Sequence, residues 1–255
     1  MIKEIANRID KIKVELERQG TIYCTDLAAL LGVSLATVRR DLEAMEGLGM
    51  LRRTHGGATA MENQDELPFH SKLKTFQNEK NRIGVAAAAL IPQNAVIGCT
   101  GGTTVVSVIK ALRGKNLTVI TNAINVAMEL APFESIDVFV TGGSLRPRSY
   151  ELIGQVADRT VSEFHFTMAL LGVDGISIEH GLSTYAIGEA HTAALYMKQA
   201  DEVWVVADHS KIGKIAPALI APITKVQRLI TDEGIGAKER VELEAAGIEV
   251  IVAES

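Results

Sequence analysis

The stretch TDLAALLGVSLATVRRDLEAMEGLGML, residues 25–51, predicts two helices with a turn at Gly32 and Val33 between them. Asp26 and Ser34 are residue types that often cap helices, so we expect one helix to follow each of them. Apolar residues recur at steps of three and four, which indicates one buried face on each helix. The expected buried positions are Leu27, Leu30 and Leu31 in the first helix and Val38, Leu42, Met45 and Leu48 in the second.

A short helix, a glycine-containing turn and a longer helix with a polar start are typical of proteins that read the DNA major groove. The second helix would present its first residues to base edges, and arginine can bind guanine or phosphate with two hydrogen bonds. The same pattern also fits ordinary surface helices whose arginines lie in solvent. The residues expected to meet DNA here are Ser34, Leu35, Ala36, Thr37, Arg39 and Arg40.

The residues on either side of this stretch complete a winged helix-turn-helix domain over residues 1–60. Residues 50–54 predict a strand, and the following His55, Gly56 and Gly57 predict a hairpin turn. Arg52, Arg53 and His55 would then lie beside the second helix and contact the DNA backbone or minor groove. Upstream, a further helix ending at Gly20 and a short strand at residues 21–23 are expected; the helix buries Ile2, Ile5, Ile9, Ile12 and Leu16.

Beyond residue 60 the pattern changes twice. Residues 61–76 are polar, contain Pro68 and show no clear periodicity, so we expect a linker there. From residue 77 to 255, continuous apolar runs alternate with helical stretches, which predicts an α/β domain with an open, mainly parallel sheet. The expected strands are residues 95–99, 117–121, 137–141, 168–173, 203–207, 229–231 and 248–252.

Composition limits the class of protein. The chain has 255 residues, 47% of them hydrophobic, and a net charge of −5, which argues against a protein that coats nucleic acid non-specifically. Residues 1–60 carry 9 Lys and Arg against 8 Asp and Glu, so a DNA-reading module is compatible with the acidic total. Two distant cysteines, no apparent secretory signal and no apolar run of membrane-spanning length predict a cytoplasmic protein that does not enter membranes.

The run from Ile22 to Ala58, with VSLATVRRDLEAMEGLGMLRRTHGGA at its centre, resembles the winged helix of the DeoR family of bacterial transcription regulators. The similarity continues through GGTT, TNA, TGG, SYELIG, GVDGI, GLST, Glu189 and ADHSK. It implies a C-terminal sensor domain of the ribose-5-phosphate-isomerase type, which binds a phosphorylated sugar or related metabolite. The expected partners are therefore double-stranded operator DNA, a phosphorylated sugar effector, and other copies of the chain in a dimer or tetramer.

The segment Gly101, Gly102, Thr103 and Thr104 joins a predicted strand to a predicted helix. Glycines allow close approach of the backbone, and the first N–H groups of a helix attract anions, so this loop is a candidate phosphate cradle. An ordinary strand-to-helix turn with a threonine cap is the plainer interpretation. Neither G-x-G-x-x-G nor G-x-x-x-x-G-K-[ST] occurs, so no nucleotide cofactor is expected.

Other strand ends are expected to converge on the same crevice, since ligands of open α/β sheets bind at the carboxyl ends of the strands. The additional residues expected at the effector site are Thr121, Asn122, Gly142, Gly143, Asp174, Glu189 and Lys211. Arg146 and Arg148 fit a phosphate contact less well than exposure to solvent, and His191 is the histidine expected to come nearest the pocket. The six histidines and two cysteines show no metal-ligand spacing, so no metal is expected.

In the sugar-phosphate isomerases that this domain resembles, acidic groups and a lysine bind sugar hydroxyls and transfer protons. Asp174, Glu189 and Lys211 could supply the base and the cation that an enediol isomerisation needs. They also suit ligand recognition alone, and an upstream DNA-reading domain favours sensing over turnover. We therefore expect a regulator without catalytic residues, with a sugar-phosphate isomerase carrying a helical N-terminal extension as the alternative.

Overall fold

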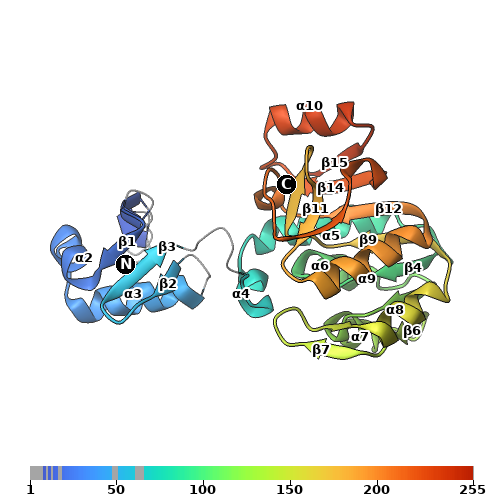
Figure 1. The fold of residues 1–255 in the computed structure, drawn as a ribbon, viewed down its shortest axis with the longest axis horizontal. Coiled ribbons are helices and arrows are strands. Elements are labelled where there is room, and N and C mark those ends of the chain that lie inside the picture. Colours follow the sequence, from blue (N-terminus) through green and yellow to red (C-terminus); the bar gives the residue numbers. More distant parts are fainter. Residues whose placement is uncertain are drawn as a thin grey trace. The chain divides into compact units, whose positions relative to one another are not determined.

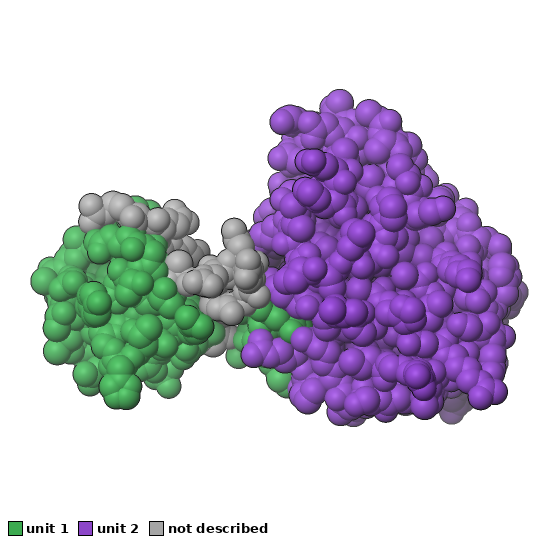
Figure 2. All heavy atoms as spheres, viewed as in Figure 1, with its two compact units in different colours: residues 1–75 green, residues 76–255 purple. Residues whose placement is uncertain are grey.

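The computed structural model describes residues 8–9, 11–12, 14–16, 19–47, 51–60 and 66–254 of the chain. The chain divides into two compact units, residues 1–75 and residues 76–255, which Figure 2 shows in different colours. Each unit has a hydrophobic core of its own. Within the described ranges, no helix is both long and apolar enough to cross a membrane.

The first unit contains helices and a three-stranded antiparallel sheet in the order β1-β3-β2 (Figure 1). Gly57 pairs with Tyr23 where β3 lies beside β1. A Cβ at Gly57 would fall 1.9 Å from the carbonyl oxygen of Ile22, so only glycine permits this pairing. Described residues between 8 and 19 are helical. The elements that follow are β1 (Thr21–Tyr23), α2 (Cys24–Leu31), α3 (Leu35–Gly47), β2 (Leu51–Arg53) and β3 (Gly57–Ala60).

Most of the helical pattern predicted for the first unit is confirmed. Ser34 lies directly before α3, and its Oγ accepts a hydrogen bond from the backbone N–H of Thr37 at 3.2 Å, as expected of a cap. The predicted buried positions with less than 5% exposure are Ile12, Leu16, Leu27, Val38, Leu42 and Met45. The predictions for Ile2, Ile5 and Leu48 lie outside the described residues.

Two predictions for residues 1–60 are wrong. Asp26 does not cap α2, because the helix begins at Cys24 and Asp26 lies inside its first turn, where its negative charge still suits the helix dipole. Leu30 is 56% exposed although Leu27, one turn earlier, is buried, so the buried face of α2 is narrower than predicted. The segment expected to be a linker, residues 61–76, is ordered in part, since it includes the helix α4 (Phe69–Lys74).

The second unit is built on a seven-stranded parallel sheet with the order β15-β14-β12-β9-β4-β5-β6. Each of the seven predicted strands is confirmed as a member of this sheet. Continuous apolar runs identified them because both faces of a parallel sheet are buried. The strands are β4 (Val96–Cys99), β5 (Leu117–Thr121), β6 (Ile136–Val140), β9 (Phe166–Leu171), β12 (Ala200–Val206), β14 (Arg228–Asp232) and β15 (Glu249–Ala253).

Helices cover this sheet, and short hairpins extend from it (Figure 1). The helices are α5 (Gln77–Leu90), α6 (Thr103–Ala111), α7 (Ile124–Leu130), α8 (Gln155–Ser162), α9 (Ile187–Lys198) and α10 (Ala237–Ala245), with 3-10 turns η1 (His209–Lys211) and η2 (Ile223–Lys225). The additional strands, which the apolar runs did not predict, are β7 (Ser144–Arg146), β8 (Glu151–Ile153), β10 (Gly175–Ser177), β11 (Gly181–Thr184) and β13 (Ala218–Ala221).

The order of the strands reverses between β4 and β9. From β4 the chain adds β5 and β6 on one side, whereas β9, β12, β14 and β15 extend on the other. Right-handed crossovers place the connecting helices of two such halves on opposite faces of a sheet, and ligands of open α/β sheets bind outside the carboxyl ends of the strands at such a reversal. Gly101 and Gly102 follow β4, and Asp174 follows β9, so predicted site residues from both strands meet at this point.

Candidate functional site

The nine residues predicted to contact DNA lie on two neighbouring elements of the first unit. Ser34, Leu35 and Ala36 are exposed at the beginning of α3, and Arg39 and Arg40 are exposed in its next turn. Thr37 is half-buried, and its hydroxyl is 2.9 Å from the capping hydroxyl of Ser34. The helix therefore presents two guanidinium groups and several small side chains along one surface.

The hairpin formed by β2 and β3 carries the other three predicted residues. Arg52 and Arg53 are exposed on β2, which contacts α3, and His55 is exposed in the turn that follows. The backbone N–H of Arg53 donates to Oε1 of Glu46 on α3 at 2.9 Å. This bond ties the wing to the helix, and all four arginines of these two neighbouring elements are exposed.

An ion pair fixes the orientation of α3. Asp41, which is only 7% exposed, accepts hydrogen bonds from Nε and Nη2 of Arg8 at 2.7 and 3.1 Å. Bidentate pairs of this kind are among the stronger side-chain interactions. The pair holds the helix against the first helix of the chain, and it occupies the carboxylate that follows Arg40 directly in the sequence.

In the second unit, the predicted phosphate cradle has the backbone that anion binding requires. Gly102 lies directly before α6 with φ of +108°, a conformation that favours glycine. The first backbone N–H groups of α6, which belong to Thr103 and the residues after it, have no acceptor within the helix. Thr103 and Thr104 are both 6% exposed, whereas Gly102 is half-buried.

Glu151, which was not singled out as a site residue, contacts this loop directly. Its Oε1 accepts a hydrogen bond from the N–H of Gly101 at 3.0 Å, and its Oε2 accepts one from Nδ2 of Asn122 at 3.0 Å. A Cβ on residue 101 would fall 2.7 Å from Oε1, so glycine makes this approach possible. The sequence signal was present in the motif SYELIG, within which Glu151 is the only acid.

Burial, and after it the negative charge of Glu189, raise the pKa of Glu151 from 4.5 to about 8, although the bonds from Asn122 and Gly101 oppose the shift. Asp174 adds a smaller repulsion in the same direction. The carboxyl group is therefore mostly neutral near pH 7. A neutral acid beside the glycine loop does not repel an anion bound there.

A chain of contacts joins five side chains near the carboxyl ends of the parallel strands. Nζ of Lys211 is 3.8 Å from Oδ1 of Asp174, and Nη1 of Arg146 donates to Oε1 of Glu189 at 2.9 Å. The hydroxyl of Thr184 lies between the two acids, 3.0 Å from Oδ2 of Asp174 and 3.1 Å from Oε2 of Glu189. The arrangement alternates acids with donors, which suits a ligand rich in hydroxyl groups.

The structure thus brings Asp174, Glu189 and Lys211 together, as the sequence predicted, although their roles stay predictions. Arg146 contradicts the expectation of a solvent-exposed loop arginine, because its side chain is only 19% exposed and pairs with Glu189. Thr184 was missed because a threonine in a short strand has no distinctive pattern. It lies within the motif GLST.

The remaining predicted residues lie around this cluster in different ways. Thr121 and Asn122 are completely buried, and Asn122 acts on the site by holding Glu151. Gly142 and Gly143 form the left-handed turn after β6, with φ of +75° and +124°. Nε2 of His191 lies 3.6 Å from Oδ2 of Asp158 on α8, and the histidine side chain is 64% exposed. His191 therefore pairs at the surface and does not approach the pocket as expected.

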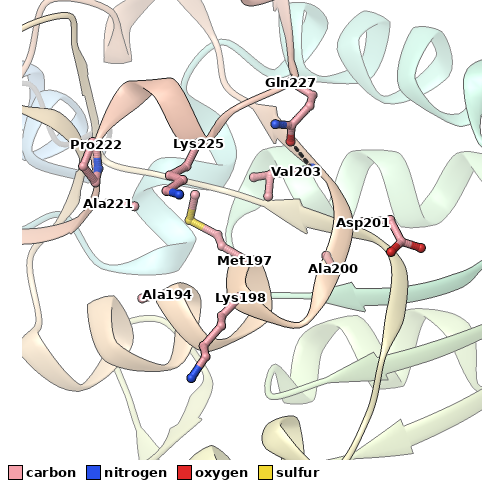
Figure 3. Close-up of a pocket in the computed structure, with 10 residues that line it drawn as sticks. All are labelled: Ala194, Met197, Lys198, Ala200, Asp201, Val203, Ala221, Pro222, Lys225 and Gln227. Carbon is pink, nitrogen blue, oxygen red and sulfur yellow. Dashed lines mark hydrogen bonds between the residues drawn. The ribbon is translucent and has the colours of Figure 1, made fainter.

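A separate cavity of about 420 Å³ lies near the first residues of β12 (Figure 3). Met197 and Val203 contribute apolar surface to it, and the exposed residues Lys198 and Lys225 stand at its edge. It opens where β12 begins, whereas the acidic cluster lies where the parallel strands finish. Among the residues that the structure describes, no group of three or more His, Cys, Asp or Glu side chains could hold a metal ion.

Two family models match this chain. One, described as the DeoR-like helix-turn-helix domain, matches residues 8–64, and the other, described as the DeoR C terminal sensor domain, matches residues 75–233. The putative aga operon transcriptional repressor of Escherichia coli O157:H7 is 34% identical over 254 residues, covering 97% of this chain and 93% of that protein.

The glycerol-3-phosphate regulon repressor of Escherichia coli K12 is 31% identical over 218 residues, covering 85% of this chain and 86% of that protein. Among solved structures, ribose 5-phosphate isomerase A from Methanocaldococcus jannaschii superposes with a TM-score of 0.41 at 18% identity. That superposition covers 54% of this chain and 55% of the isomerase.

Proposed function

This chain belongs to the DeoR family of transcription regulators, and from this premise we propose that it represses a carbohydrate-metabolism operon until a phosphorylated sugar or related metabolite binds its second unit. The observation that carries the proposal is the acid–donor cluster beside the Gly101–Thr104 loop, in a chain that also has an arginine-bearing recognition helix. The relatives above are both named as repressors, which favours a regulator over the isomerase alternative.

We assign the phosphate of the effector to the backbone of Gly102, Thr103 and Thr104. The helix start offers N–H donors and a partial positive charge, and the neutral form of Glu151 keeps the loop free of a competing negative charge. The sugar hydroxyls would then contact Asp174, Glu189 and Lys211, with Arg146 holding Glu189 in place.

We assign operator binding to α3 and the wing, in an oligomer of two or four copies. A single winged helix buries little surface, whereas two copies related by symmetry can read half-sites about 34 Å apart. The effector changes DNA occupancy only if it binds the DNA-free arrangement more tightly than the DNA-bound one.

The test is a fluorescence anisotropy titration of the full-length protein against the DNA upstream of its own gene. We expect tight binding that weakens steeply as salt is added, because lysine and arginine contacts release counterions from DNA. Ribose 5-phosphate, fructose 6-phosphate and related compounds are then added singly. We expect at least one of them both to release the DNA and to raise the melting temperature.

Failure to bind this DNA at low ionic strength, together with rapid isomerisation of a sugar phosphate, would instead support the enzyme alternative.

One arginine on α3 provides a sharper version of the DNA test. If Arg40 reads a guanine edge, Arg40→Ala should weaken operator binding by about 1–3 kcal/mol and relax specificity at one base pair. The matched control is Lys11→Ala, which removes an exposed cation from the first helix of the same unit. Equal affinity of the Arg40→Ala variant and the wild type would remove Arg40 from the interface.

A further inference from the structure

The turn η1 and its cap contact both the proposed effector site and the first residues of the second unit. Its last residue, Lys211, pairs with Asp174 in the cluster described above. Its cap is Asp208, whose Oδ1 accepts hydrogen bonds from the backbone N–H of Ser210 at 3.1 Å and from the hydroxyl of Ser210. A segment of four residues therefore reaches both into the site and away from it.

Asp208 connects the turn to α5. Its Oδ2 lies 3.7 Å from Nζ of Lys80, and these side chains are only 1% and 4% exposed. Two opposite charges buried this deeply hold each other in place, since separating them would leave a charge uncompensated in an apolar environment. The start of η1 therefore cannot move without disturbing the first turns of α5.

His209 makes a second connection, from the middle of the turn. Asp232 fixes its backbone N–H at 2.8 Å and its Nδ1 at 2.7 Å, and Gly234 leaves room for the ring, because a Cβ there would fall 2.4 Å from Nδ1. The ring of Phe76 meets the ring of His209 edge to face, with centroids 4.7 Å apart.

Phe76 is a special residue on two counts. It is the first residue of the second unit, directly after Thr75, where the chain arrives from the DNA-binding unit. Its φ is +52°, a left-handed conformation that is costly for a phenylalanine and persists only where surrounding contacts hold it. The contact with His209 and the hydrogen bond from the N–H of Lys80 to its carbonyl oxygen, at 3.0 Å, supply such contacts.

We propose that η1 couples the effector site to Phe76, through His209 and through the Asp208–Lys80 pair. An effector whose oxygens compete with Asp174 for Lys211 shifts η1, and this shift changes the support of Phe76 and the start of α5. The inference rests on the proposed function for the identity of the signal. The coupling itself is a property of contacts within residues 76–255 and is testable without any ligand.

The ligand-free test is hydrogen–deuterium exchange on the full chain. We expect Lys211→Met to increase amide exchange at residues 77–82. These residues belong to α5, far from Lys211 in the sequence and outside its turn. The matched control is Lys214→Met, an exposed lysine three residues further along. Lys211→Arg keeps the positive charge and should restore wild-type exchange. Unchanged exchange at residues 77–82 in Lys211→Met, with the variant folded, would overturn the proposal.

The second test uses Phe76→Ala with the same DNA fragment and sugar phosphates. We expect the variant to bind DNA and to keep the melting-temperature increase given by the active sugar phosphate, but to lose most of the DNA release. Val85→Ala, at an exposed position on α5, the helix that follows Phe76, should respond like the wild type. Wild-type release by Phe76→Ala would also overturn the coupling.

If no sugar phosphate acts on the wild type, the proposed effector class is wrong, and the exchange experiment alone decides the coupling.

Discussion

Among single residues, Glu151 shows how burial changes the chemistry of a side chain. Its carboxyl group is 8% exposed and lies near two other acids, yet it makes hydrogen bonds to Gly101 and Asn122 that hold it in place. Since burial opposes its ionisation, it contributes shape and hydrogen bonding near pH 7 without a full negative charge.

This state of Glu151 predicts a pH dependence of stability. Because its pKa in the folded state, about 8, exceeds the ordinary value of 4.5, the folded state binds a proton that the unfolded state releases. The stability that this bound proton contributes is fully present below about pH 4.5 and is lost as the pH rises through about 8. The free energy of unfolding of the wild type, measured in urea, should therefore fall over this window relative to that of Glu151→Gln, by an amount on the order of 4 kcal/mol.

The fluorescence of Trp204, the single tryptophan of the chain, reports this transition because it lies in the second unit. Glu163→Gln is the control, since the side chain of Glu163 is 63% exposed. A constant difference between wild type and Glu151→Gln across the pH range would show that Glu151 ionises at its ordinary pKa.

Among the helices and strands, α6 depends on the backbone that precedes it. Gly102 has open space around it, since the nearest atom to an added Cβ is Cα of Gly172 at 3.8 Å. The requirement for glycine therefore comes from the backbone conformation at φ of +108°. A side chain at this position would disturb the N–H groups at the beginning of the helix before it met any neighbour.

Gly102→Val should consequently abolish the melting-temperature increase given by the active sugar phosphate and should leave ligand-free DNA binding intact. The backbone strain should also lower stability by roughly 1–3 kcal/mol. Gly114→Val separates the two effects, because Gly114 also has a positive φ, of +85°, with no atom within 4 Å of an added Cβ. If Gly102→Val keeps the sugar-phosphate response, the cradle assignment is wrong.

For the molecule as a whole, the two hydrophobic cores are the main feature. Ile12, Leu27, Val38 and Leu42 belong to the core of the first unit, whereas Phe166 and Tyr196 belong to that of the second. Each core consists of residues from its own unit, so each unit buries apolar surface by itself. DNA binding and effector binding can then be damaged separately by changes in the two cores.

Leu42→Ala tests this independence. Leu42 is completely buried, so the change should destabilise the first unit by about 2–5 kcal/mol and weaken DNA binding. The transition reported by Trp204 in the second unit should keep its wild-type midpoint. Circular dichroism would follow the helices of both units in the same samples. A parallel shift of the Trp204 transition would show that the two units unfold together.

The sequence alone identified the elements whose pattern is local. Periodicity at steps of three and four located α3 and its buried face, and continuous apolar runs located the seven strands of the parallel sheet. The residues at the ends of those strands, including Asp174 and Lys211, could be placed at one edge because parallel strands all end there. The exposed residues of α3 followed from the same periodicity.

Other features came from the folded structure, because they join residues far apart in the chain. Arg146 meets Glu189 across 43 positions, and Glu151 meets Gly101 across 50. Short antiparallel strands bring Arg146 and Thr184 to the site, and three or four residues carry too little periodicity to predict such a strand. Whether a charged side chain is exposed or paired depends on what packs against it, which is a property of the fold rather than of its neighbours in sequence.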